Sequence, residues 1–285
     1  MYVQGRQSCA DHLGHHRRRA DVTGIEGRRS LVTGGGSGIG LATATRFAAD
    51  GAHVTICGRT EDKLGRACEE IRRRAAPTSD VRYVVADVTV DAQVQTALES
   101  AAEPDGRLDI LFCCAGGAMY IGPLAEADVE GVRATVELNL IGTFLCMKHA
   151  VPLMTDGGAM VGMSSGAGHF PHRYLWAYGM AKAGIEMLVR YAAEELAERG
   201  IRVNAVQPGI IDDELMSVIT AGGPLLDDYL AQTPISRLGT VEEVAEAVRF
   251  LAGPESAWIT GECLAVDGGH HLRRGANYGL LLGES

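Results

Sequence analysis

The sequence TGGGSGIG, residues 33–40, decides the fold of this chain. Five of its eight residues are glycine, and it lies between the apolar pair Leu31-Val32 and the helical pattern LATATRFAADG. A segment so poor in side chains contributes little to a hydrophobic core. Its bare backbone suits a tight turn from a strand into a helix, which raises the question of whether the rest of the chain repeats that alternation.

Short apolar runs do alternate with amphipathic helical patterns along the chain. The apolar runs are 30–33, 53–57, 81–85, 110–114, 159–163, 202–206 and 263–266. The helical patterns cover 38–50, 61–74, 90–102, 129–154, 177–199 and 241–251. Strands that are apolar on both faces, separated by helices, predict a parallel sheet with helices on both faces. We therefore expect an α/β fold, a single-domain Rossmann-like doubly wound parallel sheet of about seven strands.

Composition excludes several other classes of protein. The chain has 285 residues, of which 46% are hydrophobic, and a formal net charge of -10, which disfavours nucleic acid and anionic membranes as partners. No apolar run approaches the ~18 residues of a membrane span, and the basic leader lacks the apolar segment of a secretory signal. Seven irregularly spaced cysteines indicate free thiols in a reducing compartment, and no CxxC or HExxH supports a metal. We expect a cytoplasmic protein without a metal ion.

The glycine-rich loop is suited to an anionic ligand. Gly34, Gly38 and Gly40 permit a tight turn, close approach to a pyrophosphate and packing of the helix on the strand. The start of the helix adds unpaired N–H groups and a positive dipole, and Ser37 adds a hydroxyl. The spacing G-x-x-x-G-x-G differs from the dinucleotide pattern G-x-G-x-x-G, and for the loop by itself a plain tight turn is the simpler alternative.

Further motifs follow in order along the chain. They are Asp87 in VVADVT, Asn139 in ELNLIGTF, Ser165 in MSSGAG, Tyr178 and Lys182 in YGMAK, Pro208-Gly209 in NAVQPG, and the triplet DGG at 267–269. Together with TGGGSGIG, this series resembles the short-chain dehydrogenase/reductase family over residues 27 to 269. The resemblance implies an NAD(P)-dependent oxidoreductase that interconverts a secondary alcohol and a ketone.

The resemblance assigns the chemistry to Asn139, Ser165, Tyr178 and Lys182. Tyr178 and Lys182 are one helical turn apart and share a helix face, although an ordinary amphipathic helix would give the same pattern. A nearby ammonium and an oxidised nicotinamide would lower the tyrosine pKa from about 10, so that the side chain exchanges a proton with the substrate oxygen. Ser165 would hold that oxygen, or only cap a turn. Asn139 would disturb its helix and order a water beside Lys182, or only be a polar surface residue.

The cofactor contacts implied by the resemblance follow the ends of the strands, which share one edge in this fold. They are Gly34, Ser37, Gly38, Ile39, Gly40, Arg59, Asp87, Val88, Ala115, Gly116, Tyr178, Lys182, Pro208, Gly209 and Ile211. Asp87 would bind adenine, or only cap a turn with Thr89. Pro208-Gly209 and Ile211 would lie beside the nicotinamide carboxamide.

The second predicted strand bears on the choice of nucleotide. NAD-dependent members usually carry an acid at its end, where this chain has Gly58 followed by Arg59. An acid would repel a 2′-phosphate, whereas an arginine binds one with a forked contact. We therefore expect NADP(H) in preference to NAD(H). Ser37 is not basic, so a second phosphate contact of some NADP members is missing and NAD(H) stays open.

Two positions depart from the family pattern. Asn-Asn-Ala-Gly after the fourth strand reads Cys113-Cys114-Ala115-Gly116, and Cys114 is a weaker hydrogen-bonding group than asparagine, so stability or cofactor affinity should suffer. Where a threonine is common after Pro-Gly, the chain has Asp212-Asp213. These acids would disfavour anionic substrates or cap a helix of the following segment.

That following segment, residues 210–237, is irregular and resembles a lid. Its apolar residues, and others that would extend an apolar wall, are Leu215, Met216, Val218, Ile219, Leu225, Leu226, Trp176, Met119 and Tyr120. They favour an apolar, moderately bulky ketone, unless they only pack on the protein. His169 and His172 would lie at the entrance or remain solvated.

Alternatives to carbonyl chemistry are reduction of a C=C bond, a dehydratase, and a non-catalytic nucleotide-sensing protein. Family members are commonly dimers or tetramers, joined through the helices near 129–154 and 177–199 and the last strand region, so we expect a homo-oligomer, such as a homotetramer. We divide the chain into a disordered or extended segment 1–26, a catalytic domain 27–269 and a C-terminal tail 270–285.

Overall fold

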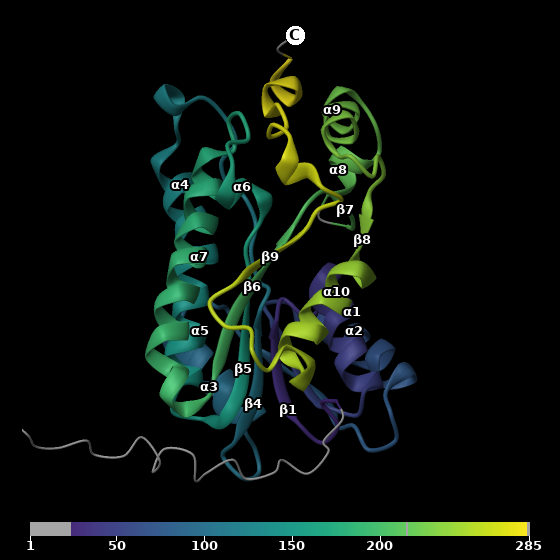
Figure 1. Ribbon diagram of the computed structural model, residues 1–285, viewed down its shortest axis with the longest axis vertical. Coiled ribbons are helices and arrows are strands. Elements are labelled where there is room, and N and C mark those ends of the chain that lie inside the picture. The colour runs from purple at the N-terminus through teal and green to yellow at the C-terminus, as the bar shows by residue number, and fades with distance from the viewer. Residues whose placement is uncertain (1–23, 215, 284–285) are drawn as a thin grey trace, which may run out of the picture.

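The computed structural model describes residues 24–214 and 216–283, and it contains the expected parallel sheet. The strand order is β3-β2-β1-β4-β5-β6-β9 (Figure 1). The strands are β1 Arg29–Thr33, β2 His53–Gly58, β3 Val81–Val85, β4 Leu108–Cys113, β5 Met154–Met163, β6 Arg202–Pro208 and β9 Cys263–Val266. Each of the seven predicted apolar runs forms one of these strands, so the predicted fold class is confirmed.

Helices cover both faces of the sheet (Figure 1). One face carries α1 Gly38–Ala49, α2 Glu61–Arg74 and α10 Val241–Ala252, and the other carries α3 Asp91–Ala101, α4 Val129–Val136, α5 Gly142–Ala150 and α7 Trp176–Leu196. The neighbours Leu31 and Val32 point to opposite faces of β1, and each is buried in a different core. Burial on both faces explains why β1 is apolar throughout rather than alternating.

The long helix predicted over 129–154 is divided into three parts, and its predicted end is wrong. α4 runs into the π-helical turn η2 Glu137–Ile141, which is followed by α5. α5 ends at Ala150, two residues before Pro152, and β5 already begins at Met154. Pro152 has no backbone N–H and so cannot donate the helical hydrogen bond to the Lys148 carbonyl, which accounts for the early end. The disturbance expected around Asn139 is present as η2.

The order of the strands places a crevice beside β1. The chain moves outward from β1 to β2 and β3, then crosses back to pair β4 with the other edge of β1. The Thr33 hydroxyl joins the two strand ends, accepting hydrogen bonds from the backbone N–H groups of Cys114 (2.9 Å) and Ala115 (3.1 Å). At such a reversal of strand order, open α/β sheets bind ligands at the carboxyl ends of the strands.

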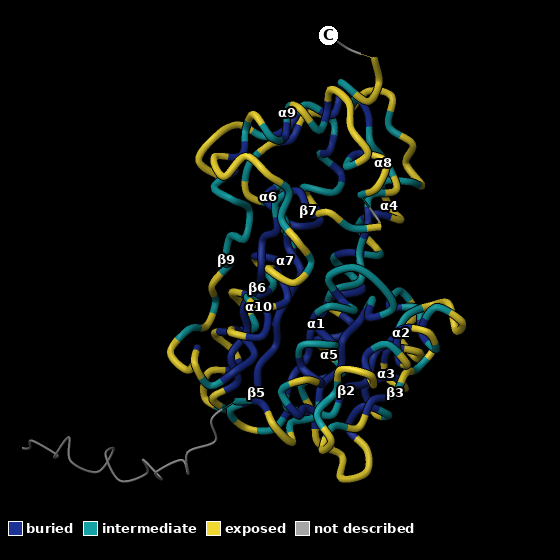
Figure 2. The backbone as a smooth tube through the Cα atoms, turned by 90° about the vertical axis from the view of Figure 1, so that its right-hand side faces the viewer, coloured by how far each residue is buried: buried dark blue, intermediate teal, exposed yellow. Residues whose placement is uncertain are grey.

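A second layer lies above that edge of the sheet (Figure 1). Its elements are α6 Gly166–His169, β7 Ile211–Asp212, α8 Ser217–Thr220, α9 Pro224–Gln232, β8 Gly239–Thr240, η5 His270–Leu272 and η6 Tyr278–Leu282. The remaining short helices are η1 Leu124–Glu126, η3 Ala197–Arg199 and η4 Pro254–Ser256. Figure 2 shows buried and exposed backbone interleaved in this layer, whereas β5 is largely buried. The layer has its own apolar cluster, to which Leu225 of α9 and Tyr278 of η6 both contribute.

Part of the predicted segment 1–26 lies outside the described residues, as does Leu215. Within the described part of that segment, Ile25 is fully buried in the core that also contains Phe47. No helix among residues 24–214 and 216–283 is long and apolar enough to cross a membrane. Across the same residues, no group of three histidine, cysteine or acidic side chains is arranged to hold a metal ion. The six described cysteines are free.

Candidate active site

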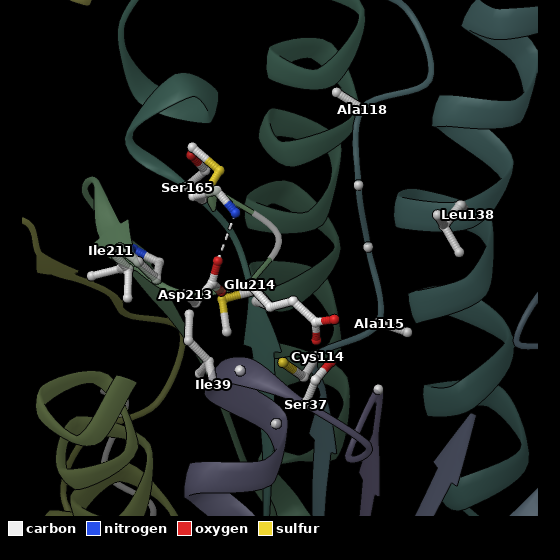
Figure 3. Close-up of a pocket in the computed structure, with 18 of the residues that line it drawn as sticks. Ser37, Ile39, Cys114, Ala115, Ala118, Leu138, Ser165, Ile211, Asp213 and Glu214 are labelled. Carbon is white, nitrogen blue, oxygen red and sulfur yellow. Dashed lines mark hydrogen bonds between the residues drawn. The ribbon is translucent and has the colours of Figure 1, made fainter. Parts of the chain in front are cut away.

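A cavity of about 630 Å³ opens at the carboxyl edge of the sheet, between the strand ends and the second layer (Figure 3). The predicted residues that line it are Gly34, Ser37, Gly38, Ile39, Gly40, Arg59, Asp87, Val88, Ala115, Gly116, Ser165, Tyr178, Lys182, Pro208, Gly209 and Ile211. The structure therefore brings together every predicted site residue except Asn139, which is buried just behind the wall.

The glycine-rich loop forms the floor beside β1 and α1, and its geometry leaves no room for side chains. A Cβ on Gly40 would lie 2.4 Å from the Gly34 carbonyl oxygen, and one on Gly34 would lie 3.1 Å from the Ala115 backbone nitrogen. Gly34 and Gly38 also have left-handed backbone angles, with φ of +66° and +53°. At Gly34 and Gly40 the backbone packs so closely that only hydrogen atoms fit, and the loop lines the cavity at the start of α1, where the first N–H groups of a helix lack helical partners.

Asp213 lies directly over this loop (Figure 3). Its Oδ1 accepts a hydrogen bond from the Met216 backbone N–H at 2.8 Å. Its Oδ2 is 3.0 Å from the position that a Cβ on Gly38 would occupy. The carboxylate therefore closes the turn before α8 and is not the cap of that helix, whose N-cap residue Met216 has no side-chain cap hydrogen bond. It also lies where the start of α1 favours negative charge.

Tyr178 and Lys182 lie on α7, as predicted, and face the closed end of the cavity. The Lys182 Nζ is 5.1 Å from the centre of the Tyr178 ring and donates a hydrogen bond to the Met163 carbonyl at 2.8 Å. The Ser165 hydroxyl lies close enough to the Tyr178 hydroxyl to lower its pKa, and it accepts a hydrogen bond from the Ala167 N–H at 3.2 Å. A tyrosine, a serine and a lysine thus converge at the end of β5.

Burial controls the protonation of this group. Lys182 is 1% exposed, and burial lowers the pKa of its ammonium to about 8. The pKa of Tyr178 is raised above its ordinary value, first by burial and then by the hydroxyl of Tyr278, while the Ser165 hydroxyl lowers it. Desolvation is the largest of these effects. The lowering expected from the ammonium together with an oxidised nicotinamide stays a prediction. Tyr178 is a protonated phenol at neutral pH, and hence a proton donor.

Asn139 is fully buried in η2 and holds the loop that follows β4. Its Nδ2 donates to the carbonyls of Gly117 and Thr135, both at 2.7 Å, and its Oδ1 accepts from the Gly117 N–H at 3.2 Å. A Cβ on Gly116 would lie 2.5 Å from this Oδ1 and 3.2 Å from the Lys182 Nζ. The side chains of Asn139 and Lys182 therefore converge on the bare backbone of Gly116, which has to be glycine.

The outer end of the cavity carries the charged residues. Arg59 is exposed on the wall between β2 and α2. Lys63, which the sequence analysis did not select, also lines the wall and pairs with Glu214 of the lid at 2.9 Å. Asp87 lines the same region, and its Oδ1 accepts hydrogen bonds from the Thr89 N–H (2.9 Å) and hydroxyl (2.8 Å). Asp87 therefore caps a turn, which was the alternative role, and it also lines the wall of the cavity.

Cys114 lies at the floor next to Ser37 (Figure 3), where the family has asparagine. Burial raises the pKa of its thiol to about 12, so it is a neutral thiol at physiological pH. The backbone N–H of Cys114 is nevertheless bonded to Thr33, which keeps the strand end in place. Thr33 was part of the quoted loop but was not predicted as a site residue.

The other half of the cavity is apolar and comes from the second layer. The predicted lid residues Met216, Val218 and Ile219 line it. Met119, Tyr120, Trp176, Leu225 and Leu226 were expected there but lie outside the wall. The Trp176 indole donates to the Gly122 carbonyl at 3.1 Å and packs on Tyr120, which turns both rings away from the cavity.

The two histidines expected at the entrance also lie outside the wall. His169 is exposed, and His172 is buried against Phe170 and His270. Burial lowers the pKa of His172 to about 4. Sequence reasoning missed Tyr229, Tyr278 and Leu281, which do line the cavity. For the last two, the signal was the apolar run YGLLL at 278–282, beyond the last predicted motif.

Comparisons with known proteins agree with this geometry. A family model described as Enoyl-(Acyl carrier protein) reductase matches residues 34–271. Cis-4-hydroxycyclohexanecarboxylate dehydrogenase of Sinomonas cyclohexanicum is 40% identical over 247 residues, covering 85% of this chain and 96% of that protein.

Solved structures give the same result. A short-chain type dehydrogenase/reductase from Mycobacterium ulcerans is 40% identical with a TM-score of 0.89, covering 91% of this chain and 95% of that one. A short chain dehydrogenase from Burkholderia cenocepacia, solved in complex with NADP, is 31% identical with a TM-score of 0.80, covering 87% and 99%. The chain belongs to the short-chain dehydrogenase/reductase family. It is an NAD(P)-dependent oxidoreductase that acts on CH–OH and C=O groups.

Proposed function

We propose that the chain interconverts an apolar ketone and its secondary alcohol, using NADP(H) in preference to NAD(H). The observation that carries this proposal is the convergence of Ser165, Tyr178 and Lys182 at the closed end of a cavity whose floor is a glycine-rich loop at a helix start. That loop fits a pyrophosphate, because its backbone is bare and it lines the cavity at the start of a helix, where N–H groups lack helical partners. When bound, the nicotinamide supplies or accepts the hydride at the carbonyl carbon.

The side chains handle the oxygen and its proton. Ser165 holds the substrate oxygen through its hydroxyl, and the Ala167 N–H fixes that hydroxyl in place. Tyr178 donates its proton to the oxygen as the ketone becomes an alcohol. The raised pKa of Tyr178 keeps the phenol protonated, which is the form that the reduction step needs. Lys182 stabilises the phenolate that remains, and Asn139 keeps the loop at Gly116 against the lysine.

Nucleotide preference is proposed from the outer end of the cavity. Arg59 extends from the loop after β2, the position at which a 2′-phosphate would need a cation, and Lys63 lies in the same wall. The NADP complex of the Burkholderia relative supports a nicotinamide nucleotide in this fold. Titration of the protein with NADPH and NADH, followed by nucleotide fluorescence, should give the lower Kd for NADPH.

Substrate class is proposed from the lid. Most of its cavity-lining residues are apolar, and its two charged ones, Asp213 and Glu214, are acids. The Sinomonas relative is named for a cyclohexane ring that carries a hydroxyl group and a carboxylate. A panel of cyclic ketones should be reduced with loss of absorbance at 340 nm. Tyr178→Phe should lower kcat by at least about 100-fold and keep nucleotide binding, since general acid catalysis typically contributes that much. Tyr83→Phe on β3 is a matched control and should keep full activity; normal turnover by Tyr178→Phe would disprove the mechanism.

C=C reduction, the chemistry in the name of the matching family model, is tested with cyclohex-2-enone. Carbonyl reduction gives an allylic alcohol, whereas enoyl reduction gives cyclohexanone, so product analysis separates the two. The alcohol is expected, because Ser165 and Tyr178 present two hydroxyls to a carbonyl oxygen.

We also propose a homo-oligomer, a dimer or tetramer, in the cytoplasm. The outer surfaces of α5 and α7 expose Phe144, Met180, Met187 and Tyr191, more apolar area than a helix facing water needs. The free state of the six described cysteines supports a reducing compartment. Size-exclusion chromatography with light scattering should give at least a dimer, and Met187→Glu should shift the mass toward the monomer.

A further inference from the structure

Two buried tyrosines face the substrate half of the cavity from segments far apart in the sequence. Tyr229 belongs to α9 of the lid and Tyr278 to η6 of the C-terminal tail, and they are 5% and 4% exposed. Their hydroxyl oxygens are 2.9 Å apart, and their rings pack edge to face with centroids 6.1 Å apart. Both residues line the cavity that contains Tyr178 and Ser165.

The hydrogen bonds of this pair are incomplete. Two hydroxyls carry two hydrogens, and the bond between Tyr229 and Tyr278 uses one of them, whichever hydroxyl donates. Among the described residues, the second hydrogen has no protein acceptor. A buried donor without an acceptor costs free energy, and both hydroxyl-bearing residues line a cavity that a ligand can enter. The pair therefore presents one O–H donor to the ligand.

The pair is packed among apolar side chains, and the rings of His172 and His270 lie beside Tyr229 with centroids 6.0 and 5.4 Å from its own. Burial lowers the pKa of both histidines, which favours their neutral form. Ile210, Ile219 and Leu225 pack around the pair in the cluster of the second layer. Burial raises the pKa of both tyrosine hydroxyls, so both stay neutral. Among the described residues that line the cavity, the cations are Arg59, Lys63 and Lys182, and none of them comes from the lid or the tail.

Basic residues of the lid and tail are engaged elsewhere. Arg274 pairs with Asp228, Arg273 donates to the Ala231 carbonyl, and Arg237 pairs with Glu243. The acids Asp213 and Glu214 line the cavity on the lid side. A carboxylate at the tyrosine pair would thus be desolvated without a counter-charge, which is unfavourable, whereas the tyrosine donor compensates a neutral oxygen for the hydrogen bond to water that it loses.

The pair is close enough to the reacting centre to contact the same small molecule. The hydroxyl of Tyr278 is one of the groups that raise the pKa of Tyr178, so the two hydroxyls interact electrostatically within one cavity. A substrate whose carbonyl oxygen lies between Ser165 and Tyr178 can therefore extend across apolar wall toward Tyr229 and Tyr278.

We propose that Tyr229 and Tyr278 form a specificity site for a second, uncharged oxygen of the substrate. The site rests on the ketone reduction proposed above and narrows its substrate class to cyclic or compact apolar ketones that carry a neutral hydroxyl, ether or carbonyl oxygen away from the reacting carbon. The tail thereby supplies a substrate-binding residue, and the lid supplies its partner.

The test compares four ring ketones that differ only at the far carbon: 4-methyl-, 4-methoxy- and 4-hydroxycyclohexanone and 4-oxocyclohexanecarboxylate. The hydroxy and methoxy compounds should show kcat/KM about 10-fold above the methyl compound, the gain of one buried hydrogen bond. Both should be preferred because the site donates and needs only an acceptor. The carboxylate should be the poorest of the four.

Two variants test whether Tyr229 and Tyr278 cause the preference for the methoxy over the methyl compound. Tyr278→Phe leaves the Tyr229 hydroxyl to donate and should reduce the preference for methoxy over methyl, while Tyr229→Phe/Tyr278→Phe should bring it to about 1. The ratio of kcat/KM values is the readout, so a general loss of activity does not affect it. Tyr83→Phe, a tyrosine on β3 far from the cavity, should keep the wild-type ratio.

The outcomes separate this inference from the function it rests on. If no ketone is reduced with either nucleotide, the proposed function is wrong. If ketones are reduced but the wild type shows no preference for the methoxy compound over the methyl compound, the tyrosine site is overturned and the proposed function stands. A preference for the carboxylate would overturn the uncharged class, and this comparison needs only the wild-type protein if the double variant does not fold.

Discussion

The two halves of the cavity are built in opposite ways. The nucleotide half consists of backbone at the ends of adjacent strands, with Gly34, Gly40 and Gly116 too close to other atoms for a side chain. The substrate half consists of side chains from the lid and the tail, which meet in their own apolar cluster and through contacts such as the Asp228–Arg274 ion pair. Enzymes that bind the same nucleotide can share one backbone geometry, whereas the side chains around the substrate can differ from one enzyme to the next. The comparison predicts that changes in one half leave the other largely intact.

The largest effect is expected from a single methyl group in the nucleotide half. In Gly40→Ala, the new Cβ would lie 2.4 Å from the Gly34 carbonyl oxygen, so the loop has to move. We expect nucleotide binding to fall below detection and the free energy of unfolding to drop by about 1–3 kcal/mol, as for overpacked sites. Nucleotide fluorescence and denaturant unfolding measure the two effects.

The control for this change is Gly65→Ala on α2, where a Cβ meets nothing within 4 Å. Alanine favours a helix over glycine, so this variant should bind nucleotide normally and gain up to about 1 kcal/mol of stability. Normal binding by Gly40→Ala would mean that the loop is not a close-packed phosphate site, and the distinction between the halves would lose its basis.

A smaller change is expected at the outer end of the nucleotide half. Arg59→Ala should raise the Kd for NADPH by about 10- to 100-fold, the value of charged hydrogen bonds to a phosphate, and leave the Kd for NADH nearly unchanged. Arg66→Ala, an exposed arginine on α2 that does not line the cavity, is the control. Equal weakening of both nucleotides by Arg59→Ala would contradict a contact with the 2′-phosphate.

The two halves also differ in how well the sequence predicts them, because one is built from backbone at strand ends and the other from side chains of separate segments. The seven strands and the nucleotide half could be predicted because each signal is local. A buried strand is apolar throughout, and the glycines of TGGGSGIG indicate a backbone with little room for side chains. The end of the helix before β5 was missed because Pro152 outweighed a pattern that otherwise continued. Asn139 was predicted as a site residue, but its bonds to Gly117 became visible only in three dimensions.

The substrate half could not be predicted because no local pattern encodes it. Tyr229 and Tyr278 are 49 residues apart and meet only because the tail packs on α9. Trp176 and Tyr120 were expected in the wall as large apolar residues, but the indole N–H bonds to the Gly122 carbonyl and turns the ring away. The composition of the lid predicts that the lid is apolar. It does not predict which of the side chains faces the ligand.

The lysine between the halves gives a pH dependence. The pKa of Lys182 is lowered from 10.5 to about 8 by burial, so kcat/KM for ketone reduction should fall about tenfold per pH unit above pH 8, if the ammonium is needed. Stability changes with the opposite sign: the unfolded chain binds the proton more tightly between pH 8 and 10.5, so unfolding becomes less favourable as pH rises through that window. Lys182→Met should lose this rise in stability, and Lys148→Met, at an exposed lysine, should keep it. A flat rate profile up to pH 10 would contradict the role of the ammonium.

The smallest effect is expected where the tail is held to the lid. Asp228 of α9 pairs with Arg274 and accepts a hydrogen bond from the Asn277 N–H at 2.8 Å, next to Tyr278. Asp228→Asn keeps an acceptor for that N–H but removes the charge, so it should loosen the tail by about 0.5–1 kcal/mol, raising the KM for ketone by about 2- to 5-fold. The exposed neighbour Asp227→Asn is the control. The Kd for NADPH should not change in either variant, because the nucleotide half is built on the sheet. If Asp228→Asn raised the Kd for NADPH as well as the KM for ketone, the tail would support both halves, and the two halves would not be independent.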